Sequence, residues 1–461
     1  MTVVVPLSPS PDPFGTCVRF SGCAYLLFLD SSAQGSLGRY SFLTADPVAV
    51  VRTPDAARQL LRAHHLPPLA GLPPFQGGCA GYLGYELGSA VEHVARPPAD
   101  LFTPRLPDAQ FALYDWVIAW DHLEEKAWLV STGIGEGGTG RSDERATARA
   151  AWVRERLAAV PAAIRDHPAP APAPPISNFE RVEFETAVSR IREYIAAGDV
   201  YQVNLSQRFH APFVGSPLAL YRRLRARNPA PFGAYLEFAG ASIASISPER
   251  FLRLDAATRE AEARPIKGTR PRGHTPEKDN ALARALVESE KDRAENVMIV
   301  DLLRNDLGRV CRTGSVSVPT LFALESHPTV HHLVSTVTGV LRDDADAFDL
   351  LQAAFPGGSV TGAPKIRAMQ IIAELERAPR GVYCGAIGYV STTGAMDFNI
   401  PIRTIVLGDG SATFHAGAGI VWDSEPAAEY QETLAKARTM IEALTSPRRM
   451  PRTPGRAHPP V

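Results

Sequence analysis

Residues 264–273 read RPIKGTRPRG and place one lysine, Lys267, between an extended dipeptide and a glycine. Proline favours an extended backbone at the residue before it, and glycine permits a tight turn. A lysine amine becomes a nucleophile only when burial or nearby cations lower its pKa, and three arginines flank Lys267 in this stretch. A solvated loop lysine has the same local sequence, so the role of Lys267 depends on what the rest of the chain supplies.

The composition is that of an ordinary globular protein. The chain has 461 residues, a formal net charge of -1 and 45% hydrophobic residues, which is enough for two domains or one large two-lobed unit. This near-neutral balance provides no basic surface for nucleic acid or for a membrane. The five cysteines are scattered and lack metal-ligand spacing, which favours buried thiols in a reducing compartment. We expect a cytoplasmic protein, because the start of the chain lacks a basic signal-peptide region and no apolar run is long enough to span a bilayer.

A proline-rich segment marks the clearest boundary in the chain. Five prolines between positions 168 and 175 predict a stiff, extended connector. We therefore divide the chain into an N-terminal region (1–160), a Pro/Ala-rich linker (161–178), a second domain (179–446) and a basic, proline-rich tail (447–461). We expect the tail to be disordered.

The hydrophobic pattern switches between the period of a strand and that of a helix, which predicts an α/β (α+β) fold. Strand patterns occupy parts of 17–51, 111–120, 126–131, 201–209, 243–254, 382–390, 397–407 and 414–422. Helical patterns occupy 141–160, 183–197, 275–303, 366–377 and 425–444. The strand at 201–209 has one apolar and one polar face, and the polar face is either exposed to solvent or lines a pocket.

Carboxylates recur at helical spacing in two segments that are far apart in the sequence. The residues are Glu288, Asp292 and Glu295 in one helix, and Glu429 and Glu432 in another. A solvated acidic face is the common meaning of such a pattern. If the two helices face each other, however, their oxygens form a site that suits Mg²⁺ better than zinc, since no histidine or cysteine accompanies them.

Other residues suit the binding of an anion. Arg403, predicted to lie on a strand, could hold a carboxylate through two hydrogen bonds. Gly417 and Gly419 allow a ligand to approach a strand closely. The glycine-rich segment 355–365 precedes a helix and offers backbone N–H groups, but it lacks the Gly-Lys-Ser/Thr of a nucleotide-binding loop. Together these features predict a pocket for a small dianion, with a metal at one end and Arg403 at the other.

Eight motifs, taken in order, carry a resemblance to a known family. They are GRYSF (38–42), GGCAGYLGYE (77–86), YQVNLS (201–206), SPERF (247–251), PIKGT (265–269), DLLRND (301–306), GSVTGAPK (358–365) and AGAG (416–419). Along nearly its whole length, the chain resembles the chorismate-utilising enzymes, in the group that holds the first components of aminodeoxychorismate synthase and anthranilate synthase. The resemblance implies a large two-subdomain fold with extensive sheets flanked by helices. Region 1–160 is then similar to the N-terminal part of anthranilate synthase component I, and 179–446 is the chorismate-binding catalytic domain.

The resemblance also implies roles for single residues. Glu295 and Glu432 match magnesium ligands, with Asp292 and Glu429 behind them through water. Arg403 and Tyr383 match residues that bind the enolpyruvyl carboxylate, and Gly419 offers its amide. The remaining matches are His332 near the leaving hydroxyl, and Ser359 and Lys436 in the substrate region. Without the resemblance, His332 would be interpreted equally well as a hydrogen-bonded core side chain.

Two positions, Gln202 and Lys267, distinguish among members of the family. Enzymes that add water to chorismate have a lysine base where this chain has Gln202, so isochorismate and salicylate synthesis are disfavoured. Anthranilate synthases have alanine in place of Lys267, whereas lysine is typical of the aminodeoxychorismate branch. The implied chemistry is attack of Lys267 on ring C2, departure of the C4 hydroxyl with a proton from Glu249, and displacement of the lysine by ammonia at C4. Glu249 must then have a raised pKa.

The implied activity is formation of 4-amino-4-deoxychorismate, in the route to 4-aminobenzoate and folate. No cysteine lies in a nucleophile-elbow context, so we expect ammonia to come from a separate glutamine amidotransferase subunit or from solution. Two alternatives remain open, namely anthranilate synthesis with Lys267 as a tolerated substitution, and a non-catalytic subunit that senses chorismate or tryptophan. The intact carboxylates, Arg403 and Lys267 argue against the sensor.

Overall fold

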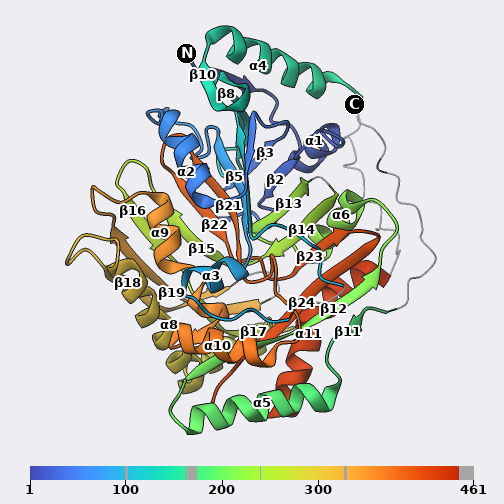
Figure 1. The fold of residues 1–461 in the computed structure, drawn as a ribbon, viewed down its shortest axis with the longest axis vertical. Coiled ribbons are helices and arrows are strands. Elements are labelled where there is room, and N and C mark those ends of the chain that lie inside the picture. The colour runs from blue at the N-terminus through green and yellow to red at the C-terminus, as the bar shows by residue number, and fades with distance from the viewer. Residues whose placement is uncertain (99–101, 161–163, 165–173, 239, 327–329, 446–461) are drawn as a thin grey trace.

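Two large antiparallel sheets and the helices around them make up the computed structural model (Figure 1), which confirms the predicted mixed α/β class. The structure describes all residues except 99–101, 161–163, 165–173, 239, 327–329 and 446–461. Most of the predicted linker and the predicted tail lie outside the described residues. None of the described helices combines the length and the apolar character needed to cross a membrane.

The larger sheet, called sheet A, combines strands from both ends of the chain. Its order is β1 (Val3–Leu7), β8 (Lys126–Ser131), β7 (Trp116–Asp121), β3 (Tyr40–Thr44), β2 (Leu27–Asp30), β13 (Phe232–Phe238), β14 (Ala241–Ser247), β23 (Thr404–Gly408), β24 (Ser411–Ile420), β12 (Gln202–Pro212) and β11 (Ile176–Ser177), with β20 (Gly362–Ala363) also beside β12. The pairing of β2 with β13 joins the regions on either side of the predicted linker.

The second sheet, called sheet B, is built in the same mixed way. Its order is β17 (Ile266–Pro271), β19 (Val330–Val340), β16 (Glu260–Ala263), β15 (Arg250–Leu254), β22 (Met396–Asn399), β21 (Ala386–Ser391), β5 (Gly78–Leu83), β6 (Ala109–Tyr114) and β4 (Ala49–Val51), with β18 (Ser317–Ser326) also beside β19. A short hairpin of β9 (Ile134–Gly135) and β10 (Thr139–Arg141) stands apart from both sheets.

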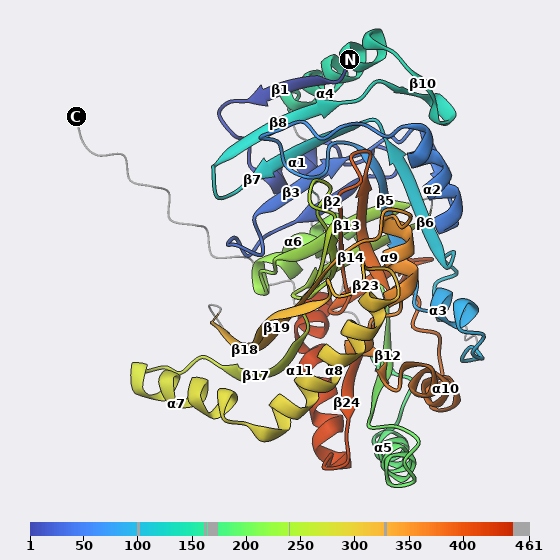
Figure 2. The same cartoon turned by 90° about the vertical axis from the view of Figure 1, so that its left-hand side faces the viewer.

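Helices cover the outer faces of the sheets (Figure 2). They are α1 (Pro13–Arg19), α2 (Pro54–Ala63), α3 (Glu86–Val91), α4 (Asp143–Ala158), α5 (Arg181–Ala196), α6 (Pro217–Arg227), α7 (Pro276–Val287), α8 (Glu290–Gly308), α9 (Ala347–Ala354), α10 (Lys365–Leu375) and α11 (Pro426–Thr445), with 3-10 turns at Glu136–Gly138 and Gly358–Val360. One apolar core lies between the two sheets, a second beneath α1, α4, α6 and α11, and a third beneath α2, α5, α8, α9 and α10.

Strand β7 shows how the sequence builds these layers. Trp116, Ile118 and Trp120 belong to the core beneath the helices, whereas Val117 and Ala119 belong to the core between the sheets. Successive strand residues point to opposite faces, and both faces of this strand are covered. A strand buried on both faces therefore has a continuous apolar sequence rather than an alternating one.

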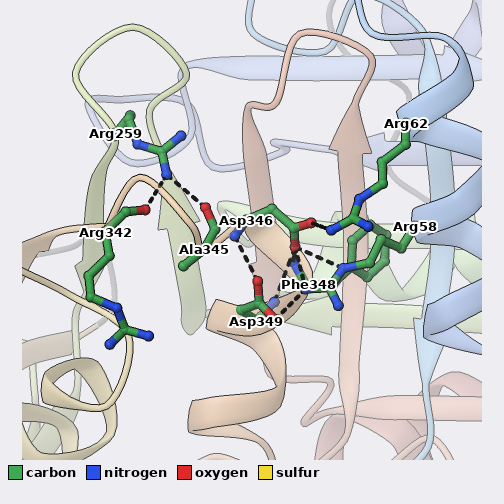
Figure 3. A network of polar contacts seen from close by, with 8 residues as sticks. All are labelled: Arg58, Arg62, Arg259, Arg342, Ala345, Asp346, Phe348 and Asp349. Atoms are coloured by element: carbon green, nitrogen blue, oxygen red, sulfur yellow. Dashed lines mark hydrogen bonds and ion pairs between the residues drawn. The ribbon is translucent and has the colours of Figure 1, made fainter.

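An ion-pair cluster ties the N-terminal region to the second half of the chain (Figure 3). Arg58 of α2 pairs with both Asp346 and Asp349 at the start of α9, and its guanidinium lies over the Phe348 ring. Asp346 also accepts hydrogen bonds from the first backbone amides of α9. The Asp346 carboxylate thus caps α9 and, through Arg58, holds α2 beside it.

Several predicted elements have different boundaries in the structure. The predicted strand 111–120 is two strands, β6 in sheet B and β7 in sheet A, which meet at Asp115. The predicted helix 275–303 is two helices, because Ser289 caps α8 and ends α7 before it. Residues 13–19, at the start of a region predicted as strands, form helix α1 with Asp12 as its cap.

Two further segments also cross from one sheet to the other, and both carry predicted site residues. The segment 243–254 forms β14 in sheet A and β15 in sheet B, with Glu249 between them. The segment 397–407 forms β22 in sheet B and β23 in sheet A, with Arg403 between them. Arg403 was predicted within a strand, but it has a left-handed backbone (φ 53°) at this crossing. The crossings bring polar side chains to the junction of the two sheets.

Candidate active site

Lys267 lies on β17, beside a bulge that begins at Gly268 (φ 85°). Its Nζ donates to the Ser359 carbonyl oxygen at 3.4 Å. Burial lowers the pKa of the Lys267 amine, and the charge of Lys436 acts in the same direction, while Glu295 and Glu249 oppose them. The amine therefore has more neutral, nucleophilic form than an exposed lysine.

The three flanking arginines do not act as the sequence suggested. Arg270 pairs with Asp292 at 2.8 Å, Arg272 pairs with Asp279, and Arg264 pairs with Glu325. Each arginine thus faces its own carboxylate. Burial and Lys436, rather than these arginines, lower the pKa of Lys267.

Glu249 and Lys267 both contact Ser359, in the 3-10 turn Gly358–Val360. Its side chain is 7% exposed, and Ser359 Oγ donates to its Oε1 at 2.9 Å. Burial raises the pKa of the Glu249 carboxyl to about 6, even though the Ser359 hydrogen bond and the charges of Lys267 and Lys436 lower it. The carbonyl oxygen of Ser359 therefore contacts the amine of Lys267, and its hydroxyl contacts the carboxyl of Glu249.

Gln202 and Gly419 complete this part of the site. A methyl group at Gly419 would lie 3.1 Å from Gln202 Nε2 and 3.7 Å from Lys267 Nζ. Gln202 is fully buried, and neither its amide oxygen nor its amide nitrogen has a hydrogen-bond partner in the described part of the chain. Buried amides are normally satisfied, so an unpartnered one beside a glycine points to space for a ligand.

Arg403 and Tyr383 lie in adjacent segments, because the Cys384 amide donates to the Pro401 carbonyl at 3.2 Å. Burial lowers the pKa of the Arg403 guanidinium. Among the described residues, no hydrogen bond or ion pair involves its side chain. A buried cation without a counter-ion suits an anionic ligand. Tyr383 is buried, and its ring stacks on His415 with centroids 5.2 Å apart.

The four carboxylates expected near a metal behave in two ways. Glu295 of α8 has no hydrogen bond or ion pair within the described ranges, and its pKa is raised by burial and by the negative charges of Asp292 and Glu432. Glu432 of α11 pairs with Lys436 at 2.7 Å. Asp292 pairs with Arg270, and Glu429 accepts a hydrogen bond from Ser424. In the described part of the chain, Glu295 therefore lies near Glu432 without a partner of its own, whereas Glu432, Asp292 and Glu429 each have one.

This arrangement fits a two-carboxylate magnesium site better than a full protein cage. In the described part of the chain, no three His, Cys, Asp or Glu side chains gather closely enough to hold a metal ion. Mg²⁺ commonly takes one or two carboxylates and completes its shell with water and substrate oxygens. Glu295 and Glu432 supply such a pair. Burial and the charge of Glu432 raise the pKa of Glu295, whereas Lys436 lowers the pKa of Glu432 against the effect of burial. Glu288, predicted to extend this face, instead lies exposed at the end of α7.

His332 lies on β19, directly opposite Thr269 of β17. Its Nδ1 lies 2.9 Å from Thr269 Oγ1, and the side chain is buried. This contact links His332 to the strand of Lys267, two residues beyond the lysine. The contact fixes the position of the imidazole, and the place of His332 near the leaving hydroxyl stays a prediction.

A buried network that was not predicted holds these parts together. Arg380 donates to the carbonyl oxygens of Val360 (2.8 Å) and Asn204 (2.7 Å), and it pairs with Glu376 at 2.7 Å. Glu376 in turn accepts from the Ser206 amide and hydroxyl. Arg380 thereby joins the loop after Ser359 to the strand of Gln202. Helical spacing could not have identified this pair, because α10 ends at Leu375 and both residues lie beyond it.

The polar face of β12, which could have been exposed to solvent or part of a pocket, is buried. Gln202, Asn204, Ser206 and Arg208 all lie below 9% exposure. These side chains share a sheet face with Gly417 and Gly419 of the neighbouring β24. Burial excludes the solvent-exposed alternative for this strand face, and the pocket alternative stays a prediction.

Comparisons with known proteins agree with this geometry. A family model described as chorismate binding enzyme matches residues 16–442. Aminodeoxychorismate synthase component 1 of Klebsiella aerogenes is 44% identical over 403 residues, 87% of this chain and 84% of that protein. Anthranilate synthase component 1 of Streptomyces coelicolor (strain ATCC BAA-471 / A3(2) / M145) is 43% identical over 427 residues, 89% of this chain and 82% of that protein. The crystal structure of anthranilate synthase component I from Streptococcus pneumoniae TIGR4 superposes with a TM-score of 0.77 at 35% identity, covering 88% of this chain and 93% of that one.

Proposed function

Because the chain belongs to the family of chorismate-binding enzymes, we propose that it converts chorismate and ammonia to 4-amino-4-deoxychorismate. It would thus act as component 1 of an aminodeoxychorismate synthase, in the route to 4-aminobenzoate and folate. The observation that carries the proposal is that Lys267 and Glu249 both hydrogen-bond to Ser359, Lys267 to its carbonyl oxygen and Glu249 to its hydroxyl. A buried amine with a lowered pKa and a buried acid with a raised pKa are the pair that two successive displacements need.

The proposed reaction consists of two successive displacements on the chorismate ring. The lone pair of Lys267 Nζ forms a bond to ring C2, the C1=C2 electrons move to C1–C6, the C5=C6 electrons move to C4–C5, and the C4–O bond breaks. Glu249 gives its proton to the departing hydroxyl, which leaves as water. Ammonia then forms the C4–N bond, both double bonds shift back to C5=C6 and C1=C2, and the C2–N bond electrons return to Lys267. The new ammonium gives one proton to Glu249, so both side chains regain their starting forms.

Other residues of the site would bind and orient the substrate. Arg403 and Tyr383 would hold the enolpyruvyl carboxylate, and Gln202 and Gly419 would line the ring. Glu295 and Glu432 would hold Mg²⁺, which when bound supplies positive charge for the ring carboxylate. A glutamine amidotransferase partner would supply ammonia, and the name of the Klebsiella protein, component 1 of a synthase, supports a partner component.

Anthranilate synthesis is the second candidate, because the Streptomyces anthranilate synthase component 1 is almost as similar to this chain. The two reactions start from the same substrate and differ in where nitrogen enters the ring. Lys267 supports the para product, since a covalent lysine at C2 directs ammonia to C4. The identity of the product decides between them.

Mass spectrometry of the products formed from chorismate, Mg²⁺ and ammonium at alkaline pH tests the proposal. Wild type should form 4-amino-4-deoxychorismate, and Lys267→Ala should lose most of this activity. Lys278→Ala, which removes an exposed lysine from α7, is the matched control and should behave as wild type. Anthranilate as the wild-type product would refute the proposal and make Lys267 a tolerated substitution.

A further inference from the structure

A cavity of about 300 Å³ lies beside the stacked rings of Tyr383 and His415. Strands of both sheets and residues 103–108 form its walls, and these include Tyr82 and Val406, which pack in the core between the sheets. Small-molecule pockets have volumes of this order and combine apolar walls with a few placed polar groups. The cavity does not contain the catalytic pair of the proposed reaction, and that reaction assigns it no role.

His415 presents a polar group at this cavity. The side chain is 5% exposed, and its Nδ1 has no hydrogen-bond partner among the residues that the structure describes. Burial, together with the charges of Arg380 and Arg208, lowers the pKa of His415 well below its usual value, so the ring is neutral at physiological pH. A buried N–H without an acceptor is rarer in proteins than a buried lone pair without a donor, so the proton belongs on Nε2. His415 can therefore donate one hydrogen bond to a ligand.

The charges around His415 favour an anion as that ligand. Arg380 and Arg208 lie close enough to lower the basicity of the imidazole. A positive charge that disfavours an imidazolium ion favours a carboxylate in the same place. Arg105 lines the cavity at its exposed rim, and it has no ion pair or hydrogen bond within the described residues. A carboxylate at His415 would therefore meet positive charge on the inner side of the cavity and at its rim.

Two carboxylates also line the cavity, but both are already engaged by protein donors. Glu86 accepts the backbone amide of Arg380 at 2.7 Å through one oxygen and that of Gly381 at 2.9 Å through the other. Asp108 accepts from Arg96 through both of its oxygens, at 2.6 and 3.3 Å. Neither carboxylate is thus left unmatched for a cationic ligand, whereas Arg105 is left unmatched for an anionic one.

The apolar part of the wall suits a ring. Tyr82 is buried, and its hydroxyl donates to the Pro107 carbonyl oxygen at 2.9 Å, so the phenol already has its polar partner. Val382 and Val406 line the same space. Aromatic rings pack favourably on one another in offset or edge-to-face arrangements. A flat aromatic acid can therefore place its ring against this wall while its carboxylate reaches His415.

We propose that this cavity is a second binding site, which takes a small aromatic carboxylic acid of about the size of benzoate. The carboxylate accepts the Nε2–H of His415 in the field of Arg105, and the ring lies against Tyr82 and Val406. The site is separate from the proposed chorismate site, and Tyr383 links the two, because it lines the cavity and is also proposed to hold the enolpyruvyl carboxylate.

Calorimetric titration of benzoate into the whole protein tests the site, with saturating chorismate and Mg²⁺ present and ammonium absent. Chorismate then fills the active site, and no amino product forms. His415→Phe removes the N–H donor but keeps a ring against Tyr383. Val406→Phe fills the cavity wall, and Arg105→Gln removes the charge at the rim. Arg154→Gln, which removes an exposed arginine from α4, is the matched control.

Wild type and Arg154→Gln should bind benzoate with the same dissociation constant. His415→Phe should raise this constant about tenfold, as expected for the loss of one hydrogen bond to a charged group. Val406→Phe should raise it by at least as much, because the new ring takes up the space of the ligand. Arg105→Gln should raise it roughly two- to fivefold, since an ion pair at an exposed rim is weak. Acetate, which has no ring, should bind about tenfold more weakly than benzoate or worse.

Several results would overturn the inference. Benzoate that fails to bind the chorismate-saturated protein, or that chorismate displaces, would have no second site. Benzylamine binding in place of benzoate would assign the cavity to a cation, held by Glu86 or Asp108. Acetate binding as tightly as benzoate would remove the ring from the recognition. Arg105→Gln alters only the exposed rim, so unchanged benzoate affinity in this variant would refute the site even if the two variants of the wall fail to fold.

This test is separate from that of the proposed function, on which the inference does not rest. Chorismate serves in it only to fill the active site, and both candidate reactions start from chorismate. Anthranilate as the wild-type product would therefore refute the lysine mechanism and leave the benzoate titration to decide the second site.

Discussion

Replacing Glu249 with glutamine should stabilise the protein above neutral pH while it abolishes activity. The carboxyl is buried, and its pKa is raised to about 6 from an ordinary value of 4.5. A group whose pKa is raised on folding favours the folded state below its unfolded pKa. That contribution is lost as the pH rises through the folded pKa. At pH 8 the native protein must therefore hold an ionised carboxylate in a site that prefers the neutral form.

The size of the effect follows from the shift. A displacement of about 1.5 pKa units at 1.36 kcal/mol per unit corresponds to roughly 2 kcal/mol at pH 8. At pH 5, where the folded group is mostly protonated, the same linkage leaves about 0.8 kcal/mol. Glutamine has the shape of the neutral acid, and its amide oxygen can still accept the hydrogen bond from Ser359.

Urea denaturation of wild type and Glu249→Gln at pH 5 and pH 8, without chorismate or magnesium, measures both values. The variant should be more stable by about 2 kcal/mol at pH 8 and by less than half of that at pH 5. Ser359→Ala is a useful companion, because it removes the hydrogen bond that lowers the Glu249 pKa and should enlarge the penalty in the parent chain. Equal stability of the two proteins at pH 8, or a difference independent of pH, would show that Glu249 is not held in a strained ionised state.

Three further substitutions probe the rest of the site. Arg380→Ala should lower the free energy of unfolding by about 3–5 kcal/mol, since it leaves Glu376 buried without its partner, and urea denaturation measures this loss. Arg403→Gln should weaken chorismate binding roughly 10- to 100-fold through loss of a charged hydrogen bond, as read by calorimetry, and unchanged affinity would remove Arg403 from the carboxylate site. Gly419→Ala places a methyl 3.1 Å from Gln202 Nε2 and should raise KM for chorismate, while the melting temperature stays close to that of the parent protein.

The sequence predicted elements better than the points where they change direction. Helices α5 and α11 and the alternating strand β12 lie within a few residues of their predicted ends, because each has a strong apolar period. The predicted strand 397–407 failed at Arg403, where a left-handed backbone carries the chain from one sheet to the other. Such a crossing depends on which strands pair across the molecule, and a local pattern contains no record of that pairing.

The sequence motifs identified residues of the candidate site, but they did not predict the contacts that these residues make once they are buried. Lys267 and Glu249 were identified together, yet their shared contact with Ser359 appears only in the fold. The arginines beside Lys267 seemed to be its electrostatic partners, but each has a carboxylate of its own. His415 was missed, although it lies two residues before Gly417 and therefore on the same strand face.

The mixed composition of the sheets constrains the order in which the protein can fold. Strand β2 pairs with β13, and β5 pairs with β21, so that Cys79 lies beside Val390. An N-terminal half emerging from the ribosome has its own hairpins but lacks the strands that complete either sheet. The sheets can close only after synthesis of β21 to β24, the last of which ends at Ile420. We expect slow, highly cooperative folding of a nascent chain that needs protection of its unpaired strand edges until then.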